Sequence, residues 1–328
     1  MSPDRKKKPG ITAAIETILE SDAAGDPMSD RRWTHVTAAK VAVRLSADFA
    51  INVSATTVGR LLGVLDYSLK SNKKCLSSGR SAGRDCQFGV IKSLREDFVA
   101  GGEPVISVDT KKKELIGQFK NAGRTWRREA KKVKDHDFRS EAEGIAAPYG
   151  IYDIQRNFGA LVVGRSADTP EFAVNSILTW WQLHGRNDYP GAKRLLILAD
   201  SGGSNGAAPK MWKKHLQEKI ADSYGLEVTV AHYPSGASKW NPIEHRMFSE
   251  LSKNWAGIPL ESFDTVLNYA NGTATKNGLH IAAYSDPGEY AKGIKATKAE
   301  FKKLAVIHND TLGKWNYTIM PRAEGAGQ

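Results

Sequence analysis

Residues 193–206, "KRLLILADSGGSNG", contain the strongest strand signal in the chain. The run from Leu195 to Ala199 is apolar without alternation, as in strands that are covered by helices on both faces of a sheet. Asp200 ends this run, and the glycines that follow it suit a turn where backbone or substrate approaches closely. The stretch therefore predicts a buried strand of an α/β sheet with a carboxylate at its end.

The segments on both sides of this strand predict the rest of the sheet. Upstream, the patterns predict short strands at 104–109 and 113–119, a hairpin over 150–168 that turns at 155–159, and a helix over 169–185. Downstream, they predict a helix over 208–225, a strand over 227–234 and a helix from Pro242. This order predicts a mixed sheet flanked by helices, an α/β layer fold.

Residues 11–21 and 37–72 have helical patterns, and residues 73–103 have the composition of a linker that contains a helix-like stretch. We predict a basic tail with a short helix over 1–32, a helix-turn-helix domain over 33–74 and a linker over 75–103. The α/β domain then covers 104–322, and a tail covers 323–328. Small helix pairs also occur in many proteins that never bind DNA. If this pair does bind DNA, its candidate contacts are Ser54, the N-cap of the second helix, with Thr56, Thr57 and Arg60.

The charge of the chain is the first indication of a partner. Lys and Arg outnumber Asp and Glu by 47 to 36, a net charge of +11. Residues 111–134 alone hold ten basic and two acidic residues, a local net of +8, with Trp126 among them. A solvated surface is the simplest explanation of such a run, but so strong a field attracts polyphosphates, and an aromatic ring can stack on bases. Nucleic acid is the predicted partner class.

Other compositional features bear on the compartment. The chain has two cysteines, too few for a disulfide framework or a four-thiolate zinc site. No apolar run approaches the roughly 18 residues of a membrane span, and the charged N-terminus does not have the pattern of a signal peptide. We therefore expect a cytoplasmic protein, associated with the nucleoid, and no membrane partner.

Three carboxylates lie at the ends of predicted elements. Asp109 ends the first predicted strand of the α/β domain, Asp200 ends the strand described above, and Glu244 falls in the first turn of a helix. Each has a structural explanation, since Asp often ends a strand and Glu244 can complete a capping box with Asn241. Strand ends are also where ligand sites gather in α/β sheets, and three converging carboxylates would repel one another without a cation. A pair of oxygen-seeking divalent ions would answer that repulsion.

Four segments resemble a known family when taken together. They are "VISVDTKKKELIGQFKNAGRTW" (105–126), "LILADSGGSNG" (196–206), "SKWNPIEHRMFSELSKNW" (238–255) and "GKWNYTIMPR" (313–322). These segments are similar to the ISAzo-type insertion-sequence DDE transposases of bacterial mobile elements, and the likeness runs from about residue 20 to residue 322. The resemblance implies a ribonuclease H-like core and a catalytic triad of Asp109, Asp200 and Glu244.

The resemblance also implies an activity and its partners. The family's reaction is Mg²⁺-dependent hydrolysis at element ends, followed by attack of the freed 3′-hydroxyl on target DNA. Two Mg²⁺ ions, replaceable by Mn²⁺, would bind the triad, and two or more copies of the chain would assemble on double-stranded DNA. Candidate DNA contacts, each with a solvated-surface or helix-surface role as the alternative, are Lys111, Lys112, Lys113, Arg124, Trp126, Arg127, Arg128, Lys239 and His245.

Two alternatives are open at this point. The turn 202–206 fits G-x-S-x-G, the nucleophile elbow of serine α/β-hydrolases, with Ser204 as nucleophile. That elbow needs a helix directly after the serine, whereas Pro209 predicts a helix that begins several residues later. The second alternative is a non-catalytic DNA-binding repressor derived from a transposase, because family members usually have more N-terminal sequence than precedes "RKKKPG". Metal-dependent cleavage would separate this alternative from an active enzyme.

Overall fold

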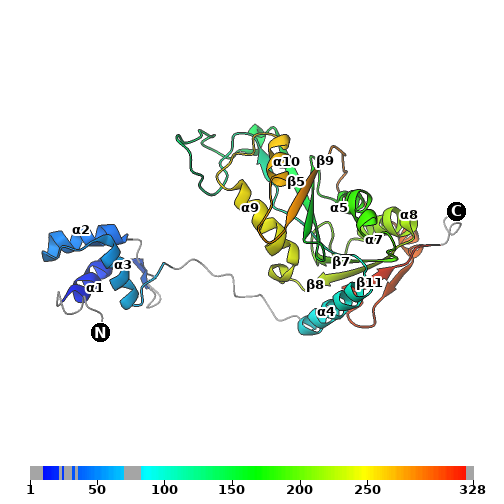
Figure 1. Ribbon diagram of the computed structural model, residues 1–328, viewed down its shortest axis with the longest axis horizontal. Coiled ribbons are helices and arrows are strands. Elements are labelled where there is room, and N and C mark those ends of the chain that lie inside the picture. The colour runs from blue at the N-terminus through cyan, green and yellow to red at the C-terminus, as the bar shows by residue number, and fades with distance from the viewer. Residues whose placement is uncertain (1–9, 22–23, 26–31, 34–35, 70–82, 323–328) are drawn as a thin grey trace. The chain divides into compact units, whose positions relative to one another are not determined.

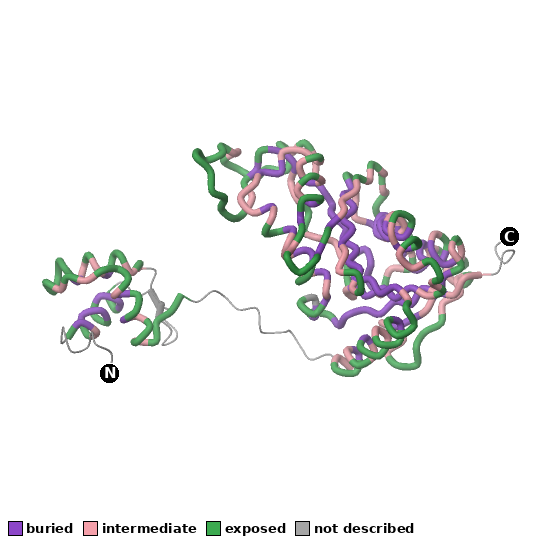
Figure 2. The backbone as a smooth tube through the Cα atoms, viewed as in Figure 1, coloured by how far each residue is buried: buried purple, intermediate pink, exposed green. Residues whose placement is uncertain are grey.

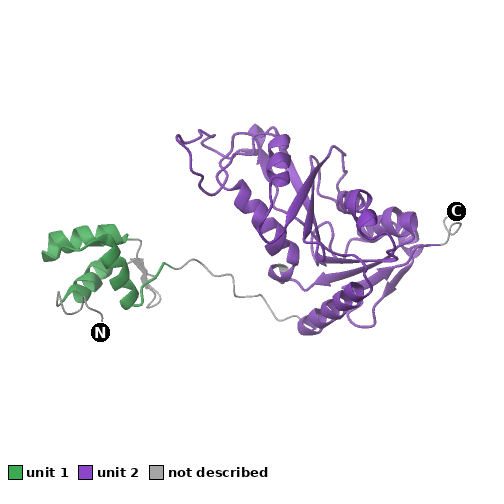
Figure 3. Cartoon of the chain, in the orientation of Figure 1, with its two compact units in different colours: residues 1–76 green, residues 77–328 purple. Residues whose placement is uncertain are grey.

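The structure is a computed structural model that describes residues 10–21, 24–25, 32–33, 36–69 and 83–322. The predicted tails, the "RKKKPG" segment and part of the predicted linker lie outside these residues. The chain divides into two compact units, residues 1–76 and 77–328 (Figure 3). Among the described residues, no helix has both the length and the apolar character needed to cross a membrane.

The N-terminal unit is a small helical body. It contains α1 (Ile11–Ser21), α2 (Ala38–Phe49), α3 (Ala55–Val64) and a two-stranded ribbon of β1 (Ala24–Gly25) and β2 (Arg32–Trp33). The Ser54 side chain accepts a hydrogen bond from the Thr57 amide at 3.2 Å and caps α3, as expected. Apolar residues of all three helices form one core. The helix α1 therefore packs with the predicted helix pair, whereas the sequence patterns had placed it in a separate tail.

The second unit is built on a mixed sheet. Its strands in the described residues follow the order β10-β11-β8-β7-β3-β5-β6-β9, with β4 paired to β5 at the side (Figure 1). The neighbours β3–β7, β7–β8 and β6–β9 run parallel, and the other pairs run antiparallel. The strands are β3 (Val105–Thr110), β4 (Glu114–Ile116), β5 (Gly144–Asp153), β6 (Phe158–Gly164), β7 (Arg194–Asp200), β8 (Glu227–Tyr233), β9 (His280–Asp286), β10 (Val306–His308) and β11 (Asn316–Ile319).

Helices cover both faces of this sheet, so its central strands are buried (Figure 2). The helices are α4 (Arg84–Ala100), α5 (Pro170–Trp180), α6 (Arg186–Asp188), α7 (Lys210–Leu216), α8 (Asp222–Tyr224), α9 (Ser249–Trp255), α10 (Phe263–Asn271) and α11 (Lys298–Lys302). Short π turns, η3 (Trp181–Gly185), η4 (Gln217–Ala221) and η6 (Glu244–Phe248), extend three of these helices, and η2 (Arg139–Glu141) and η5 (Ser238–Trp240) are 3₁₀ turns. The predicted architecture, a mixed sheet flanked by helices with an N-terminal helical domain, is confirmed.

The pleat of the strands separates two cores. Along β3, Ile106 and Val108 point to the core beneath α5 and α7, while Val105 points to the core beneath α4. Since side chains alternate along a strand, Ser107 and Asp109 share the face of Val105. The helix η6–α9, together with α10, covers the neighbouring part of that face. This face is where the candidate site forms.

Several sequence-based expectations for this unit can be compared with the structure. The hairpin over 150–168 is present as β5 and β6, and Pro209 stands at the start of α7 as predicted. The segment 75–103 differs from the predicted linker, because α4 lies within it. Ile91 and Phe98 of α4 are buried against β3, β7 and β8. Packing of these apolar side chains makes α4 part of the α/β unit.

Candidate catalytic site

Two of the predicted carboxylates lie at one edge of the sheet. The strands β3 and β7 are parallel neighbours with Val108 opposite Ala199, so Asp109 and Asp200 follow at the next position of each strand. Both side chains lie on the face of η6 by the alternation of the pleat. Thr110, next along β3, donates its amide hydrogen to Asp109 Oδ1 at 2.8 Å. The sequence prediction that these two aspartates lie together is consistent with this register.

The third carboxylate comes from the helix that begins at Pro242. Its side chain lies within hydrogen-bonding reach of Asp109, which means that Glu244 and Asp109 can share a proton. No side chain caps the turn η6, and the Asn241 side chain bonds elsewhere. The capping-box explanation of Glu244 is therefore wrong, because its carboxylate is directed to the strand ends.

Burial and mutual repulsion dominate the electrostatics of these three groups. Burial, then the charge of Asp200, raises the pKa of Asp109 from 3.8 to about 8. Burial and the charge of Asp200 also raise the pKa of Glu244, and burial raises the pKa of Asp200, although its hydrogen bond from Asn241 acts in the opposite direction. A cation would relieve this repulsion and replace the proton that the cluster holds without it.

A buried hydrogen-bonded clamp ties the two strands to the helix. Ser107 and Asn241 are both 0% exposed, and the Ser107 hydroxyl donates to Asn241 Oδ1. Asn241 Nδ2 donates to Asp200 Oδ1 at 3.2 Å, and Ser107 Oγ accepts the Ile243 amide at 3.2 Å. The clamp fixes the Asp200 carboxylate and the start of the Glu244 helix together. Sequence reasoning assigned Asn241 to a helix cap and missed Ser107, which reads as one polar residue within a strand.

A second buried chain holds the backbone at Asp200. His232 Nδ1 lies 3.0 Å from the Asp200 carbonyl oxygen, which can only accept, so Nδ1 carries the hydrogen. His232 Nε2 then accepts from the Tyr317 hydroxyl at 3.1 Å, and that hydroxyl accepts from Trp212 Nε1 at 3.0 Å. Burial lowers the pKa of His232 to about 4, so the ring is neutral near pH 7. The closing motif "GKWNYTIMPR" thus contributes Tyr317 to the support of this edge.

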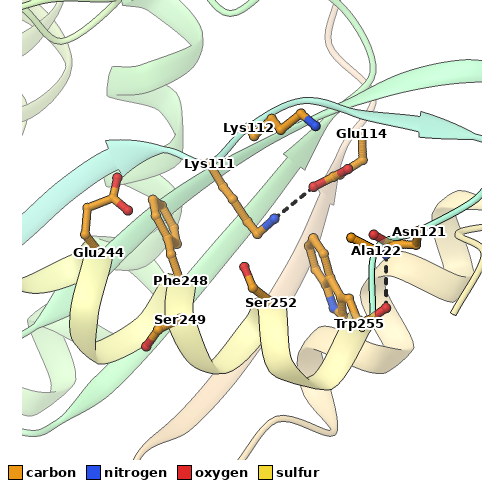
Figure 4. Close-up of a pocket in the computed structure, with 10 residues that line it drawn as sticks. All are labelled: Lys111, Lys112, Glu114, Asn121, Ala122, Glu244, Phe248, Ser249, Ser252 and Trp255. Atoms are coloured by element: carbon orange, nitrogen blue, oxygen red, sulfur yellow. Dashed lines mark hydrogen bonds and ion pairs between the residues drawn. The ribbon is translucent and has the colours of Figure 1, made fainter. Parts of the chain in front are cut away.

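Two hollows lie beside the carboxylates. One, of about 430 Å³, is lined by Asp109 and Asp200 together with the glycine turn after β7. The other, of about 490 Å³, contains Glu244 at one end and extends along α9 to Trp255 (Figure 4). All three carboxylates therefore line open space that a ligand could enter.

The donor set fits a divalent cation. No group of three His, Cys, Asp or Glu side chains in the described ranges is arranged to hold a metal ion as it stands. Mg²⁺, however, keeps several of its waters and binds through one or two carboxylates. Asp109 and Asp200 at adjoining strand ends, each with its pKa raised, supply the oxygens that such an ion prefers. Glu244 supplies a third carboxylate beside them.

The basic residues near the site have different surroundings. The Lys111 side chain is 10% exposed, pairs with Glu114 at 2.8 Å and lies 4.5 Å from the centre of the Trp255 ring (Figure 4). Its charge is therefore partly neutralised, whereas Lys112 and Lys113 are exposed. The Trp126 side chain is 105% exposed, and its neighbours Arg124, Arg127 and Arg128 are exposed as well. A fully exposed indole among arginines offers a flat ring face on which a base could stack.

Other predicted contact residues lie on the surface with local interactions. Lys239 Nζ lies 4.0 Å from the centre of the Trp240 ring, and the exposed His245 ring contacts the Lys239 carbonyl oxygen. This contact gives His245 a local structural role at the start of its helix. In the N-terminal unit, the side chains of Ser54, Thr56 and Arg60 lie at the exposed surface of α3 and its cap, and Thr57 is half-buried.

The structure lacks the features that a serine hydrolase with Ser204 as nucleophile would need. The Ser204 hydroxyl is buried and has no hydrogen-bond partner in the described structure, so no base is placed to activate it. The following helix, α7, begins at Lys210, well after the serine. A nucleophile elbow requires both features.

Comparison with known proteins gives one family and several structures. The family described as "Rhodopirellula transposase DDE domain" matches residues 14–321. The structure is similar to a Mos1 transposase paired-end complex with the left transposon end, with TM-score 0.42 and 12% identity over 79% of this chain and 69% of that chain. It is also similar to a mariner Mos1 paired-end complex with Mg, with TM-score 0.43 and 12% identity over 80% of this chain and 71% of that chain. No curated protein matches the chain.

Proposed function

Because the chain belongs to the Rhodopirellula transposase DDE-domain family, we propose that it cleaves DNA at the ends of an insertion sequence and joins those ends to target DNA. One observation supports this proposal above others. Asp109, Asp200 and Glu244 come from two strand ends and a helix and form one half-buried carboxylate cluster, in which burial, and then the charge of Asp200, raises the pKa of Asp109 to about 8. Such a cluster has no structural use of its own and calls for a cation.

The three carboxylates have separate tasks in this proposal. Asp109 and Asp200 would hold the divalent ions, Mg²⁺ or Mn²⁺, at the ends of β3 and β7, and Glu244 would supply the third carboxylate. When bound, the ions activate the attacking oxygen and stabilise the leaving one. The clamp through Asn241 holds the Asp200 carboxylate in place at the end of β7.

The reaction itself has two stages that use the same residues. In the first, water cleaves a phosphodiester at the element end and leaves a free 3′-hydroxyl. In the second, that hydroxyl attacks a phosphodiester of target DNA, forms the new bond and displaces a 3′-oxygen there. Before a cation binds, the cluster of Asp109 and Glu244 retains a proton, which it releases on binding.

The DNA contacts extend from this cluster. Lys112, which lines the hollow beside Glu244, and the exposed Lys113 next to it contact phosphates, and Arg124, Arg127 and Arg128 contact phosphates farther along the strand. Trp126 stacks on an exposed base or deoxyribose. In the N-terminal unit, α3 contacts double-stranded DNA of the element end through Thr56 and Arg60. As the resemblance to the insertion-sequence DDE transposases implies, at least two copies of the chain act together on DNA. We expect this activity in the cytoplasm, at the nucleoid.

Cleavage of DNA that carries the ends of the element tests this function. The unsubstituted protein and a matched control, Glu250→Gln on the same helix, should cut in the presence of Mg²⁺ or Mn²⁺ and not in EDTA. Glu244→Gln should fold and bind the same DNA but not cut it, because glutamine lacks the charge that the cation requires. Equal cutting by Glu244→Gln would remove Glu244 from the triad. Binding without any cutting by the unsubstituted protein would favour the repressor alternative.

A further inference from the structure

Three buried oxygens around the hollow of Asp109 and Asp200 have no hydrogen-bond partner in the described structure. They are Thr110 Oγ1, Tyr149 OH and Asp168 Oδ1. Thr110 and Asp168 line that hollow themselves. Buried polar atoms are nearly always paired, because a lone one costs about 1–3 kcal/mol. Two such atoms in the lining of one hollow, with a third on the cross-strand partner of Thr110, indicate a polar ligand that is not part of the protein chain.

Asp168 has no evident structural task. It directly precedes the helix α5, but the N-cap of that helix is Thr169, whose hydroxyl accepts the Phe172 amide at 3.3 Å. Asp168 is therefore not needed as the cap, and one of its oxygens is buried without a donor. Its place opposite Asp109 and Asp200 in the lining of the same hollow is the remaining feature to explain.

Tyr149 brings a neutral hydroxyl to the same place. Its side chain is 0% exposed and packs edge-on against Phe172, with 6.1 Å between the ring centres. In the sheet, Tyr149 is the cross-strand partner of Thr110. Burial, then the charges of Asp109 and Asp168, raises the pKa of Tyr149, so its hydroxyl stays protonated.

We propose that Asp168 is a fourth carboxylate of the cation site and binds the hydrated divalent ion of Asp109 and Asp200 through its water, which the Tyr149 hydroxyl also contacts. Binding through water suits Mg²⁺ and Mn²⁺, since Mg²⁺ retains several waters in protein sites. The inference rests on the proposed function, because that function supplies the cation.

Direct measurement of Mn²⁺ binding tests the inference without relying on activity. The full chain is titrated with Mn²⁺, and the free ion is followed by its electron paramagnetic resonance signal. Asp168→Asn should bind Mn²⁺ about tenfold more weakly, as expected when a partner of a metal's outer shell is lost. Asp310→Asn, an exposed aspartate on the loop between β10 and β11, should bind like the unsubstituted protein. Asp109→Asn should lose binding.

A second variant keeps the test decisive if Asp168→Asn does not fold. Tyr149→Phe removes only a hydroxyl that has no protein partner, so it should fold, and it should bind Mn²⁺ several-fold more weakly. Unchanged affinity in Tyr149→Phe, or in a folded Asp168→Asn, with binding lost in Asp109→Asn overturns this inference and leaves the proposed function standing. Unchanged affinity in Asp109→Asn, or no Mn²⁺ binding by the unsubstituted protein, overturns the proposed cation site as well.

Discussion

The clamp formed by Ser107 and Asn241 predicts a measurable coupling in stability. Ser107→Ala leaves Asn241 Oδ1 and the Ile243 amide without the hydroxyl that serves both. Asn241→Ala leaves the Ser107 hydroxyl without an acceptor and Asp200 Oδ1 without its donor. Both residues are fully buried, so water cannot replace the lost partners in the native packing.

The magnitudes follow from the number of groups left unpaired. A buried polar group without a partner costs about 1–3 kcal/mol and each single variant leaves two such groups, so each should lower the free energy of unfolding by about 2–6 kcal/mol. In the double variant both partners of the Ser107–Asn241 hydrogen bond are absent, so neither of them is left buried and unpaired. Its cost should therefore fall short of the sum of the single costs by about 1–3 kcal/mol.

Urea unfolding, followed by tryptophan fluorescence, measures the free energy of unfolding of four metal-free proteins: the unsubstituted protein, the two single variants and the double variant. Ser176→Ala is a suitable control, because Ser176 is equally buried but its hydroxyl bonds only a carbonyl one helical turn away. Its cost should be below about 1 kcal/mol. Additive effects of the two substitutions, or single costs no larger than that of the control, would refute the reasoning.

Three further predictions concern other parts of the molecule. The folded-state pKa of Asp109 is about 8 against 3.8 unfolded, so the metal-free protein should lose stability, relative to Asp109→Asn, as pH rises from about 4 to about 8. Thermal unfolding across this range should show the melting temperature of the unsubstituted protein falling relative to that of Asp109→Asn as pH rises. A melting-temperature difference that does not change with pH would contradict the raised pKa of Asp109. Tyr317→Phe removes the donor to His232 and the acceptor of Trp212, and should cost about 1–3 kcal/mol in urea unfolding; no loss would mean that the buried chain contributes nothing. Trp126→Ala should leave the melting temperature unchanged but weaken DNA binding roughly tenfold in fluorescence anisotropy, because one stacked base is worth about 1–3 kcal/mol. Ile307→Ala, an exposed apolar residue on β10, is its control, and equal effects on DNA binding would argue against stacking.

Much of the architecture could be read from local patterns. The apolar run Leu195–Ala199 predicted a central strand, and such a run has no stable alternative to burial between two helical layers. Pro209 and Ser54 marked helix starts because their backbone and side-chain preferences act within one turn. The three carboxylates stood out for the same reason, since each follows or begins a clear element.

Local sequence patterns could not predict the roles of Asn241, Ser107, Tyr149 and Asp168. Each has an ordinary local explanation, as a cap, a strand residue or a residue before a helix, and their partners lie in other elements. The contact between Ser107 and Asn241, for example, joins residues 134 positions apart. Likewise, the segment of α4 looked like a linker because its sequence is only weakly amphipathic, and its burial depends on the sheet beside it. The sequence alone therefore determined the elements and the acids at their ends, because these depend on interactions within a few residues. Only the tertiary structure decided how the acids are held and which neighbours join them, because burial and register across the sheet set those contacts.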